Sequence, residues 1–344
     1  MDDQTTRAGG EKRRSGPVTI AYIAENAGVS VPTVSKVLNG RPGVSDDTRA
    51  RIEDLIIRYG YRRPPYRSNS LELVFRELES MWAVEIIRGV EQVARKHRVG
   101  VTLSEFGLHD AMPEPMDDMV DRRPKAVLSV AQLSDAEREQ LAANGIPFVV
   151  FDPISELPGD VPFVGATHWR GGQTATRHLI ELGHRRIAMI CGPVGQLCFD
   201  ARTAGYTFAM AASGLPVDPA LTVEAPPSRE GGHAAAGRLF ALADRPTAVF
   251  ASNDLQAIGV YQAAREAGMR VPDDVSVVGF DDVPVAAWVD PPLTTIHQPL
   301  AQMAVAATEL ALALGRGEEA PQIGVELATT LMVRGSTAPP KAAE

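Results

Sequence analysis

Apolar positions near the N-terminus recur at helical spacing in two short segments separated by a glycine. The first segment has one apolar stripe, at positions i, i+3, i+4 and i+7, formed by Ile20, Ile23, Ala24 and Ala27. Gly28 permits the positive φ that ends a helix, and Ser30 can cap the next helix, whose first turn accommodates Pro32. The pattern predicts a helix-turn-helix, a DNA-binding motif, although two core helices of a larger α domain would look the same.

A third helical segment follows. Ser45 precedes Asp46 and Asp47, whose carboxylates suit the positive end of a helix dipole. Its apolar stripe is formed by Ile52, Leu55, Ile56 and Tyr59, before a stop at Gly60. Three helices around one core predict an all-α head over residues 17–62. We expect a disordered polar tail at 1–16 and a linker at 63–70, where Pro64-Pro65 favours extended chain.

From Leu71 onward, apolar strands alternate with amphipathic helices in two series. The strands of the first series are predicted at 73–75, 100–106, 125–131 and 146–152, with helices at 84–96, 116–120 and 135–143. The second series has strands at 186–192, 221–225, 247–254 and 275–282, with helices at 202–212, 231–243 and 255–267. This alternation predicts a core over residues 71–337 made of two α/β subdomains, each with a doubly wound parallel sheet. A ligand cleft is expected between them, at the carboxyl ends of the strands.

Charge is distributed unevenly along the 344 residues. The net charge is −9, but residues 1–66 carry eleven Lys or Arg against eight Asp or Glu, which leaves −12 on the remainder. A mildly basic head on an acidic body suits a phosphate-binding module carried by a larger domain.

Composition also argues against several classes of protein. No apolar run is long enough to cross a bilayer and the first residues lack the apolar core of a signal peptide, so we expect a cytoplasmic protein. Cys191 and Cys198 are too few for a disulfide framework or a zinc site, and we expect incidental buried thiols. The sequence predicts no cofactor and no metal.

Longer motifs are more specific than the periodicity. AGVSVPTVSKVLNG, VSDDTRARI and GYR resemble the head of the lactose-repressor/galactose-repressor (LacI/GalR) family of transcription regulators. HLIELGHRRIAMICGP, RPTAVFASNDLQAIGVYQAAREAGMRVPDDVSVVGFDDVP and PPLTTIHQP look like that family's sensor core, in the same order. The resemblance runs from about Val18 to about Pro339. It implies a helix-turn-helix head on a core shaped like periplasmic sugar-binding proteins. It also implies that dimers bind palindromic operators and that a small molecule, usually a sugar, changes the affinity.

The resemblance places DNA contacts on the second helix and its turn. Val31, Pro32 and Lys36 match positions that face base edges; Lys36 can donate to guanine O6 and N7, whereas Val31 offers only apolar contact. Positions that usually bind phosphates, and so fix register, are matched by Thr19, Ser30, Thr33, Ser35 and Asn39. Each of these could instead be a cap or a surface group.

The linker departs from the family pattern. Members commonly continue into a hinge helix whose leucine enters the minor groove and kinks the DNA. This chain has Arg63-Pro64-Pro65-Tyr66-Arg67 instead, without a leucine at the expected place and with two prolines that oppose a helix. We therefore expect a plain linker; Tyr66 or Arg67 in the minor groove is the alternative.

In the sensor, the resemblance implies an effector site. Arg202 matches a cleft arginine that binds ligand hydroxyls or carboxylates. Trp82 falls near an aromatic position that can stack on a sugar ring. Polar groups at strand carboxyl ends are matched by Asn253, Asp254 and Asp281, with Asp152 as a weaker candidate from the first subdomain.

Some assignments in the sensor stay open. Asn253 could simply cap the helix that follows it. Trp169 and Trp288 fit either cleft walls or a packed interface. Thr167 and His168 stand where the family often has Asp-Asn, so the sequence does not name the ligand.

Two rival classes share features of the core. A sugar-acting enzyme would need paired catalytic groups, but no GxSxG or HExxH motif occurs, and the adjacent Asp281 and Asp282 would point to opposite faces. A solute-binding protein would carry a signal sequence and no DNA-binding head. The sequence therefore favours a repressor that responds to a sugar. Tetramers of the family that this chain resembles use an added C-terminal apolar heptad segment; none follows Thr337, so the resemblance implies a homodimer.

Overall fold

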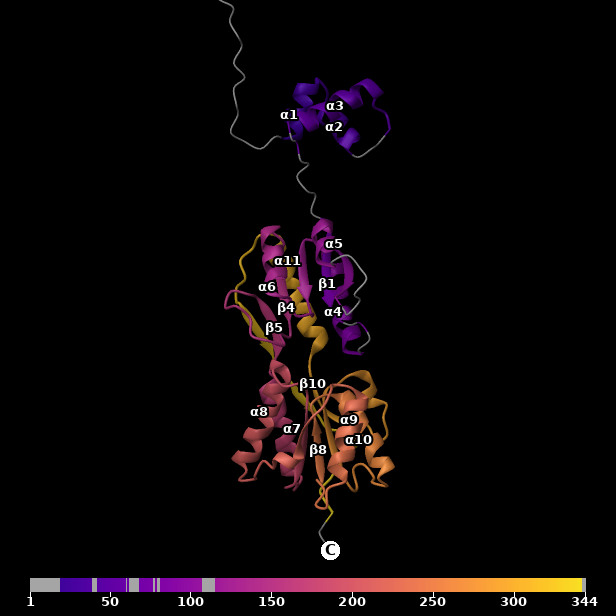
Figure 1. The fold of residues 1–344 in the computed structure, drawn as a ribbon, viewed down its shortest axis with the longest axis vertical. Helices are drawn as coiled ribbons and strands as arrows, with labels where there is room; N and C mark the ends of the chain where they lie inside the picture. Colours follow the sequence, from indigo (N-terminus) through magenta and orange to yellow (C-terminus); the bar gives the residue numbers. More distant parts are fainter. Residues whose placement is uncertain are drawn as a thin grey trace, which may run out of the picture. The chain divides into compact units, whose positions relative to one another are not determined.

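The computed structural model describes residues 19–38, 42–59, 61, 68–76, 78, 81–106 and 115–341. These residues form two compact units, within Met1–Arg67 and Ser68–Glu344 (Figure 1). Several sequence-based expectations lie outside the described residues: the tail at 1–16, Asn39, the stop at Gly60, and the linker at 63–67.

The N-terminal unit is the predicted three-helix head. Its helices are α1 (Ile20–Ala27), α2 (Val31–Leu38) and α3 (Asp46–Arg58). Gly28 ends α1 at φ 64°, in the left-handed region that glycine adopts without a steric penalty. The head has a single apolar core, which is formed by Ile23, Ala24, Ala27, Val34, Val37, Ile52, Leu55 and Tyr61.

The first sheet of the sensor is entirely parallel. Its strand order is β11-β5-β4-β3-β1-β2. The strands are β1 (Ser70–Phe75), β2 (Gly100–Glu105), β3 (Ala126–Ser129), β4 (Phe148–Phe151), β5 (Phe163–Ala166) and β11 (Gly324–Leu327). The helices on this sheet are α4 (Met81–His97), α5 (Pro115–Arg122), α6 (Asp135–Ala143) and α11 (Leu300–Gly315). Alternate residues of β1 face opposite sides: Leu71 and Leu73 pack with α4 and α11, whereas Val74 packs with α5 and α6.

The second sheet has the order β12-β10-β9-β8-β6-β7 and is parallel except for the edge pair β10–β12. Its strands are β6 (Ile187–Cys191), β7 (Thr222–Glu224), β8 (Ala248–Ala251), β9 (Ser276–Asp281), β10 (Thr294–His297) and β12 (Thr330–Met332). On one face lie α7 (His168–Glu181) and α8 (Leu197–Ala212); on the other lie α9 (Arg229–Phe240) and α10 (Asp254–Glu266) (Figure 1). Short 3₁₀ turns occupy Pro219–Leu221 and Pro284–Ala287. Among the described helices, none is long and apolar enough to cross a membrane.

The two subdomains are not two consecutive stretches of chain. The sequence pattern predicts one series of elements for each subdomain, but α11 and β11 return to the first sheet after β10 has completed most of the second. The chain therefore crosses between subdomains three times, near Thr167, Gln298 and Thr329. Residues 165–183 had no predicted element, and they contain α7, whose buried face is mostly small or polar and thus gives no apolar stripe.

Glycines bring the helices of the second subdomain into backbone contact. A Cβ on Gly172 of α7 would lie 2.2 Å from the Arg202 carbonyl oxygen of α8, and one on Gly205 would lie 2.2 Å from the Trp169 oxygen. The pair α9 and α10 is packed in the same way at Gly232. Such contacts leave no room for a methyl group and fix each helix pair as a rigid layer.

Two glycine substitutions in α9 test this packing. A Cβ at Gly232 would lie 2.2 Å from the Gln256 carbonyl oxygen, so we expect Gly232→Ala to lower the free energy of unfolding by about 1–3 kcal/mol. Gly237, in the same helix, has no atom within 4 Å of an added Cβ. We expect Gly237→Ala to raise stability by up to about 1 kcal/mol through helix propensity. Urea unfolding of the sensor transition measures both, and an equal gain in the two variants would contradict the close contact.

Candidate functional site

The exposed face of α2 carries the residues that were predicted to read bases. Val31 is 40% exposed, and Pro32 and Lys36 are also exposed, whereas Val34 and Val37 point into the head core. Within the part of the chain that the structure describes, no hydrogen bond or ion pair holds the Lys36 ammonium group. This face therefore presents an extended cation beside apolar groups, which is a surface that can enter a DNA groove.

Hydroxyl groups at the helix starts serve as caps. The Thr19 hydroxyl accepts from the Tyr22 backbone N–H at 3.2 Å, at the first turn of α1. The Ser30 hydroxyl accepts from the Thr33 N–H at 3.3 Å and lies 2.9 Å from the Thr33 hydroxyl. The alternative reading of Thr19 and Ser30 as caps is thus confirmed. Both residues stay exposed, so a cap and a phosphate contact are compatible.

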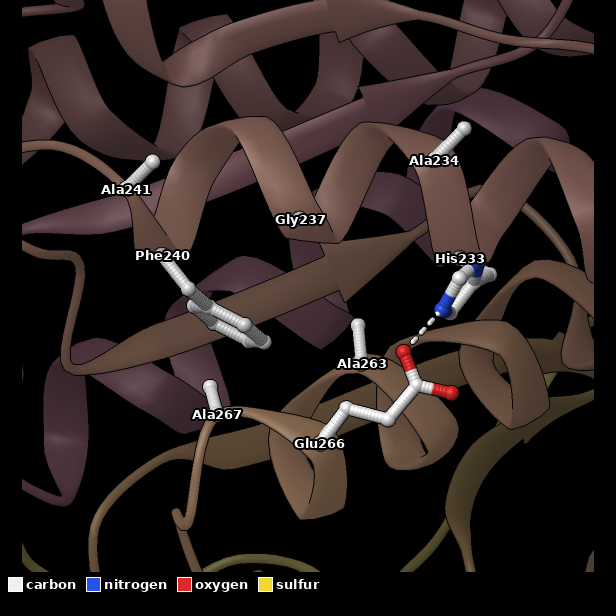
Figure 2. A pocket seen from close by; sticks show the side chains of 8 residues that line it. All are labelled: His233, Ala234, Gly237, Phe240, Ala241, Ala263, Glu266 and Ala267. Carbon is white, nitrogen blue, oxygen red and sulfur yellow. Dashed lines mark hydrogen bonds and ion pairs between the residues drawn. The ribbon is translucent and has the colours of Figure 1, made fainter.

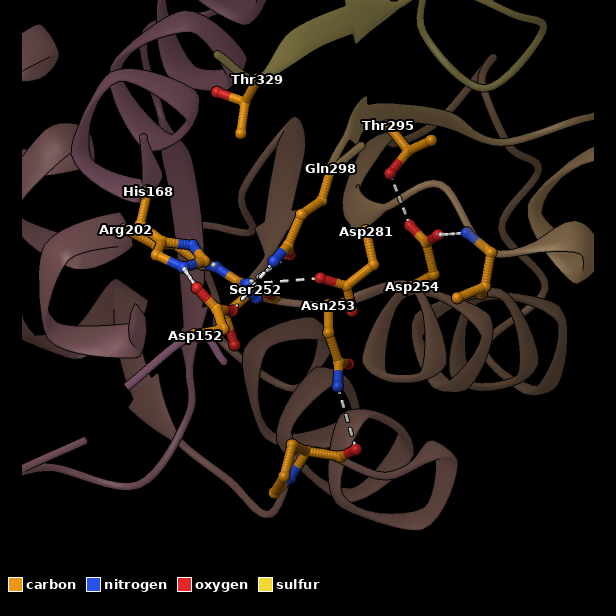
Figure 3. A network of polar contacts seen from close by, with 12 residues as sticks. Asp152, His168, Arg202, Ser252, Asn253, Asp254, Asp281, Thr295, Gln298 and Thr329 are labelled. Atoms are coloured by element: carbon orange, nitrogen blue, oxygen red, sulfur yellow. Dashed lines mark hydrogen bonds and ion pairs between the residues drawn. The ribbon is translucent and has the colours of Figure 1, made fainter. Parts of the chain in front are cut away.

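In the sensor, polar side chains from both subdomains converge on the guanidinium group of Arg202 (Figure 3). Arg202 lies on α8, its side chain is 4% exposed, and all three of its nitrogens have protein acceptors. Nη1 donates to the Ser252 carbonyl oxygen at 2.5 Å, and Nη2 lies 3.2 Å from Asp281 Oδ1 and 3.3 Å from Gln298 Oε1. The Phe280 ring centre lies 3.7 Å from the guanidinium carbon, an additional cation–π contact. We call Asp152, His168, Arg202, Asp281 and Gln298 the Arg202 cluster.

His168 joins Arg202 to the first subdomain. Arg202 Nε donates to His168 Nδ1 at 3.3 Å, and because a guanidinium N–H can only donate, Nδ1 must be an acceptor. His168 Nε2 in turn donates to Asp152 Oδ1 at 2.8 Å. Asp152 follows β4 of the first sheet, so the relay Arg202–His168–Asp152 spans both subdomains.

Gln298 makes the second link between the subdomains. Its amide nitrogen donates to Asp152 Oδ2 at 2.9 Å, while its amide oxygen accepts from Arg202. It stands in one of the three crossovers, between β10 and α11. The other two crossovers are tied together by hydrogen bonds between Thr167 and Thr329, at 3.0 to 3.2 Å. Two of the three crossovers are therefore hydrogen-bonded to each other, and the third contributes Gln298 to the cluster.

The two carboxylates of the cluster have opposite pKa shifts. Burial raises the pKa of Asp281 to about 6, and the nearby Asp152 carboxylate adds to the rise, although Arg202 and His168 counteract both. Burial would also raise the pKa of Asp152, but the contacts with His168, Arg202 and Gln298 lower it below its ordinary value. Asp281 has φ 106°, an uncommon backbone conformation for a residue other than glycine, and Asp152 has φ 48°. Strained backbone held at polar side chains is typical of functional sites.

Three of the predicted effector residues lie outside this cluster. Asp254 is completely buried: it accepts from the Thr295 hydroxyl at 2.5 Å and from the Val283 N–H at 2.9 Å, and burial raises its pKa well above the ordinary value. Asn253 caps α10 by accepting from the Gln256 N–H at 2.8 Å, as the alternative reading predicts. Trp82 is half-buried on α4 and packs against Phe75 at a centroid distance of 6.2 Å.

Four residues of the site were not among the predicted ligand groups: His168, Ser252, Phe280 and Gln298. His168 was noted only as a departure from the family pattern. Gln298 follows a strand in the PPLTTIHQP motif, so its position at a strand carboxyl end was the available signal. Ser252 contacts Arg202 through its backbone carbonyl oxygen, so its side chain gives no indication of this contact in the sequence.

Other polar groups have structural partners. Asp282 pairs with Arg334 at 2.6 Å and His297 at 3.0 Å, whereas Asp281 pairs with Arg202, so these adjacent carboxylates do point apart. His184 is buried between the Thr247 and Ser276 hydroxyls. Cys191 and Cys198 are buried free thiols, as predicted. In the described ranges, no group of three or more His, Cys, Asp or Glu is arranged to hold a metal ion.

A surface groove of about 350 Å³ lies elsewhere, between α9 and α10 (Figure 2). Its lining is mostly Ala, Gly and Phe240, with one ion pair at 2.7 Å between His233 and Glu266. The groove contains no member of the Arg202 cluster. The polar chemistry of the sensor is therefore concentrated at the junction of its two subdomains.

Comparisons with known proteins agree with both parts of this architecture. Residues 19–64 match the model of bacterial regulatory proteins of the lacI family, and residues 176–337 match the periplasmic binding protein-like domain. The HTH-type transcriptional regulator MalR of Streptomyces coelicolor is 35% identical over 93% of this chain and 96% of its own length.

Solved structures show the same similarity along nearly the whole chain. The transcriptional regulator CelR–cellobiose complex has a TM-score of 0.72 at 31% identity, covering 93% of this chain and 99% of that one. The lac repressor dimer bound to operator and the anti-inducer ONPF has a TM-score of 0.69 at 25% identity, covering 94% and 100%. These relatives are regulators rather than enzymes. With a helix-turn-helix head, a two-subdomain sensor and this degree of identity, the chain belongs to the LacI family of bacterial transcription regulators.

Proposed function

We propose that this protein is a sugar-responsive repressor that binds a palindromic operator as a homodimer. One observation carries the proposal: one chain contains both a helix-turn-helix head and a polar cluster that joins the two subdomains of a sensor. A solute-binding protein would share the sensor without the head. The protein would act in the bacterial cytoplasm, where its operator is.

The head supplies the DNA contacts of this proposal. α2 would lie in the major groove, with Lys36 donating to a guanine edge and Val31 and Pro32 in apolar contact with neighbouring bases. The backbone phosphates would be contacted by Thr19, Ser30, Thr33, Ser35 and Asn39. One head reads only half of a palindrome, so two copies would bind half-sites one helical turn apart. The relative crystallised as a lac repressor dimer on its operator supports this stoichiometry.

The Arg202 cluster supplies the effector site. A sugar would enter beside Asp281, Arg202 and Gln298 and exchange hydrogen bonds with them. The similarity to CelR, which was solved as a cellobiose complex, supports a sugar as the ligand. Trp82 and Asp152 would complete the site from the first subdomain. Asp254 and Asn253 would act indirectly, because their polar atoms already bind the protein.

The coupling would run through the crossovers. Asp152 is hydrogen-bonded to His168 and Gln298, and these bonds span the two subdomains. When a ligand takes their place, the relative position of the subdomains changes. A changed subdomain position alters the spacing of the two heads, and heads that no longer match the half-sites release the operator.

Lys36→Ala tests the operator contact. If Lys36 reads a guanine, the variant loses about 1–3 kcal/mol of operator binding and also loses preference at that base pair. Fluorescence anisotropy on the operator and on single-base variants measures both effects. Arg58→Ala, which removes one exposed charge from α3, controls for net charge. An equal loss on every sequence would make Lys36 a phosphate contact instead.

Asp281→Ala and Arg202→Ala test the effector site. We expect both variants to lose the sugar-induced release of operator while they keep operator affinity in the absence of sugar, because the cluster lies in the sensor and not in the head. Operator release is followed as sugar is added, and circular dichroism checks the fold. Wild-type effector affinity in both variants would remove the Arg202 cluster as the effector site.

A further inference from the structure

Two helices of the first subdomain, α4 and α5, are each followed by an arginine in the left-handed backbone region. Arg98 has φ 53° and Arg123 has φ 49°. Both residues turn the chain as a helix cap does: the Arg98 N–H donates to the Arg95 carbonyl oxygen at 3.2 Å, and the Arg123 N–H to the Val120 carbonyl oxygen at 3.0 Å. Glycine usually occupies such a position, because a Cβ is strained there. We call Arg98 and Arg123 the cap arginines.

The other helices with a left-handed residue at their described ends have glycine there. Such a residue stands one or two positions after α1, α6, α7, α8, α10 and α11, as Gly28, Gly145, Gly183, Gly214, Gly268 and Gly317. Only α4 and α5, among the helix ends that the structure describes, carry the strain of a side chain in this conformation. Strain that is retained at particular residues is an indication of function.

The cap arginines flank the point where the chain enters the sensor. The Ser68 N–H donates to the Arg123 carbonyl oxygen at 2.9 Å, and the Asn69 side-chain nitrogen donates to the Arg98 carbonyl oxygen at 2.7 Å. Seven residue steps separate Ser68 from Tyr61 in the head, and a fully extended chain of that length spans at most about 25 Å. A tether this short keeps DNA that the head binds at a high effective concentration near the start of the sensor.

Both side chains are exposed, and in the described part of the chain no hydrogen bond or ion pair holds their guanidinium groups. Neighbouring arginines on the same helices differ in this respect. Arg95 of α4 pairs with Glu91 at 2.5 Å, and Arg122 of α5 pairs with Glu72 at 2.5 Å. The cap arginines therefore each present a full positive charge to solvent. A guanidinium group stays protonated in proteins, and its fork of N–H donors matches the oxygens of a phosphate.

This excess of positive charge is local. Residues 67–344 carry a net charge of −12, so the sensor as a whole repels DNA. The cap arginines lie at the amino ends of β2 and β3, and in these parallel strands both ends lie at the same edge of the sheet as the start of β1. Cations collected on an acidic domain at the linker are suited to a polyanion that the linker brings there.

We propose that Arg98 and Arg123 bind backbone phosphates of the operator from the sensor, in addition to the contacts made by the helix-turn-helix head. This inference rests on the proposed function and adds to it a second DNA-contacting surface. Phosphate contacts strengthen binding on every sequence and carry no base preference. The sensor would thus contribute affinity to the complex, while base discrimination stays with the head.

Glycine at both positions separates DNA binding from a structural role. In the full-length protein, the double variant Arg98→Gly, Arg123→Gly removes both charges and supplies the residue that a left-handed backbone favours. The probe is a fluorescein-labelled duplex with the palindrome that the wild-type protein selects from a random pool. Anisotropy titrations between about 50 and 200 mM salt give the affinity and its salt dependence.

We expect the affinity of the glycine variant at low salt to fall at least about tenfold. The slope of log affinity against log salt should become shallower by about 3 to 4, since a dimer loses four phosphate contacts at about 0.9 each. The base preference should stay that of the wild type, in contrast to Lys36→Ala. The urea midpoint should stay at or above the wild-type midpoint, because glycine relieves the backbone strain.

Two further double variants serve as controls. Arg98→Lys, Arg123→Lys keeps both charges, so we expect the wild-type salt slope. Arg170→Ala, Arg265→Ala removes two exposed charges from α7 and α10 of the second subdomain, and here also we expect the wild-type slope. A shallower slope in this second control, equal to that of the glycine variant, would reduce the effect to net charge and overturn the inference.

An unchanged salt slope in the glycine variant, with its fold verified by circular dichroism, overturns the inference and leaves operator binding by the head in place. A lower urea midpoint with an unchanged slope does so as well, and would make the cap arginines partners of the helix dipoles instead. If the wild-type protein selects no palindrome from the pool, the proposed function fails and this inference fails with it.

Discussion

The buried charge of Arg202 is the constraint on which the arrangement of the sensor depends. A guanidinium group does not lose its proton in a protein, so a buried arginine needs acceptors on every side. Here they come from an imidazole, a backbone carbonyl, an amide and a carboxylate on four separate segments, over the face of Phe280. His168 and Gln298 are also hydrogen-bonded to Asp152 of the first subdomain. The acceptors that Arg202 needs therefore hold the two subdomains together.

The sensor combines rigidly packed helix pairs with a polar junction between its subdomains. Helix pairs α7–α8 and α9–α10 are in backbone contact through Gly172, Gly205 and Gly232, so neither pair can slide without a large steric penalty. The crossovers contain polar residues such as Thr167, Gln298 and Thr329, whose hydrogen bonds can be exchanged for others. Because these rigid helix pairs both belong to the second subdomain, a change in the relative position of the subdomains would fall on the three crossovers, as in hinge closure.

The head follows a simpler physical scheme. Its core is formed by aliphatic residues and Tyr61, and the hydroxyls of Thr19 and Ser30 satisfy backbone N–H groups at the starts of α1 and α2 that would otherwise lack partners. With Val31 and Pro32 exposed beside it, Lys36 is the long polar side chain on the outer face of α2. In the proposed operator complex, base discrimination would therefore depend on fewer polar side chains than the phosphate contacts do.

The sequence alone determined the elements whose signals are local. The turn at Gly28, the alternating strands and helices, the Asn253 cap and the positions of Arg202 and Asp281 all follow from periodicity, capping chemistry and family motifs. Only the tertiary structure decided which distant segments share a site. It returned α11 and β11 to the first sheet, buried Asp254 against Thr295 and Val283, and brought Gln298 and His168 to Arg202. The physical reason is that a helix of small and polar residues, such as α7, has no apolar periodicity in its sequence that would indicate which segments pack against it. Those partners are set by the need to satisfy a buried charge, and that need exists only once the subdomains have packed.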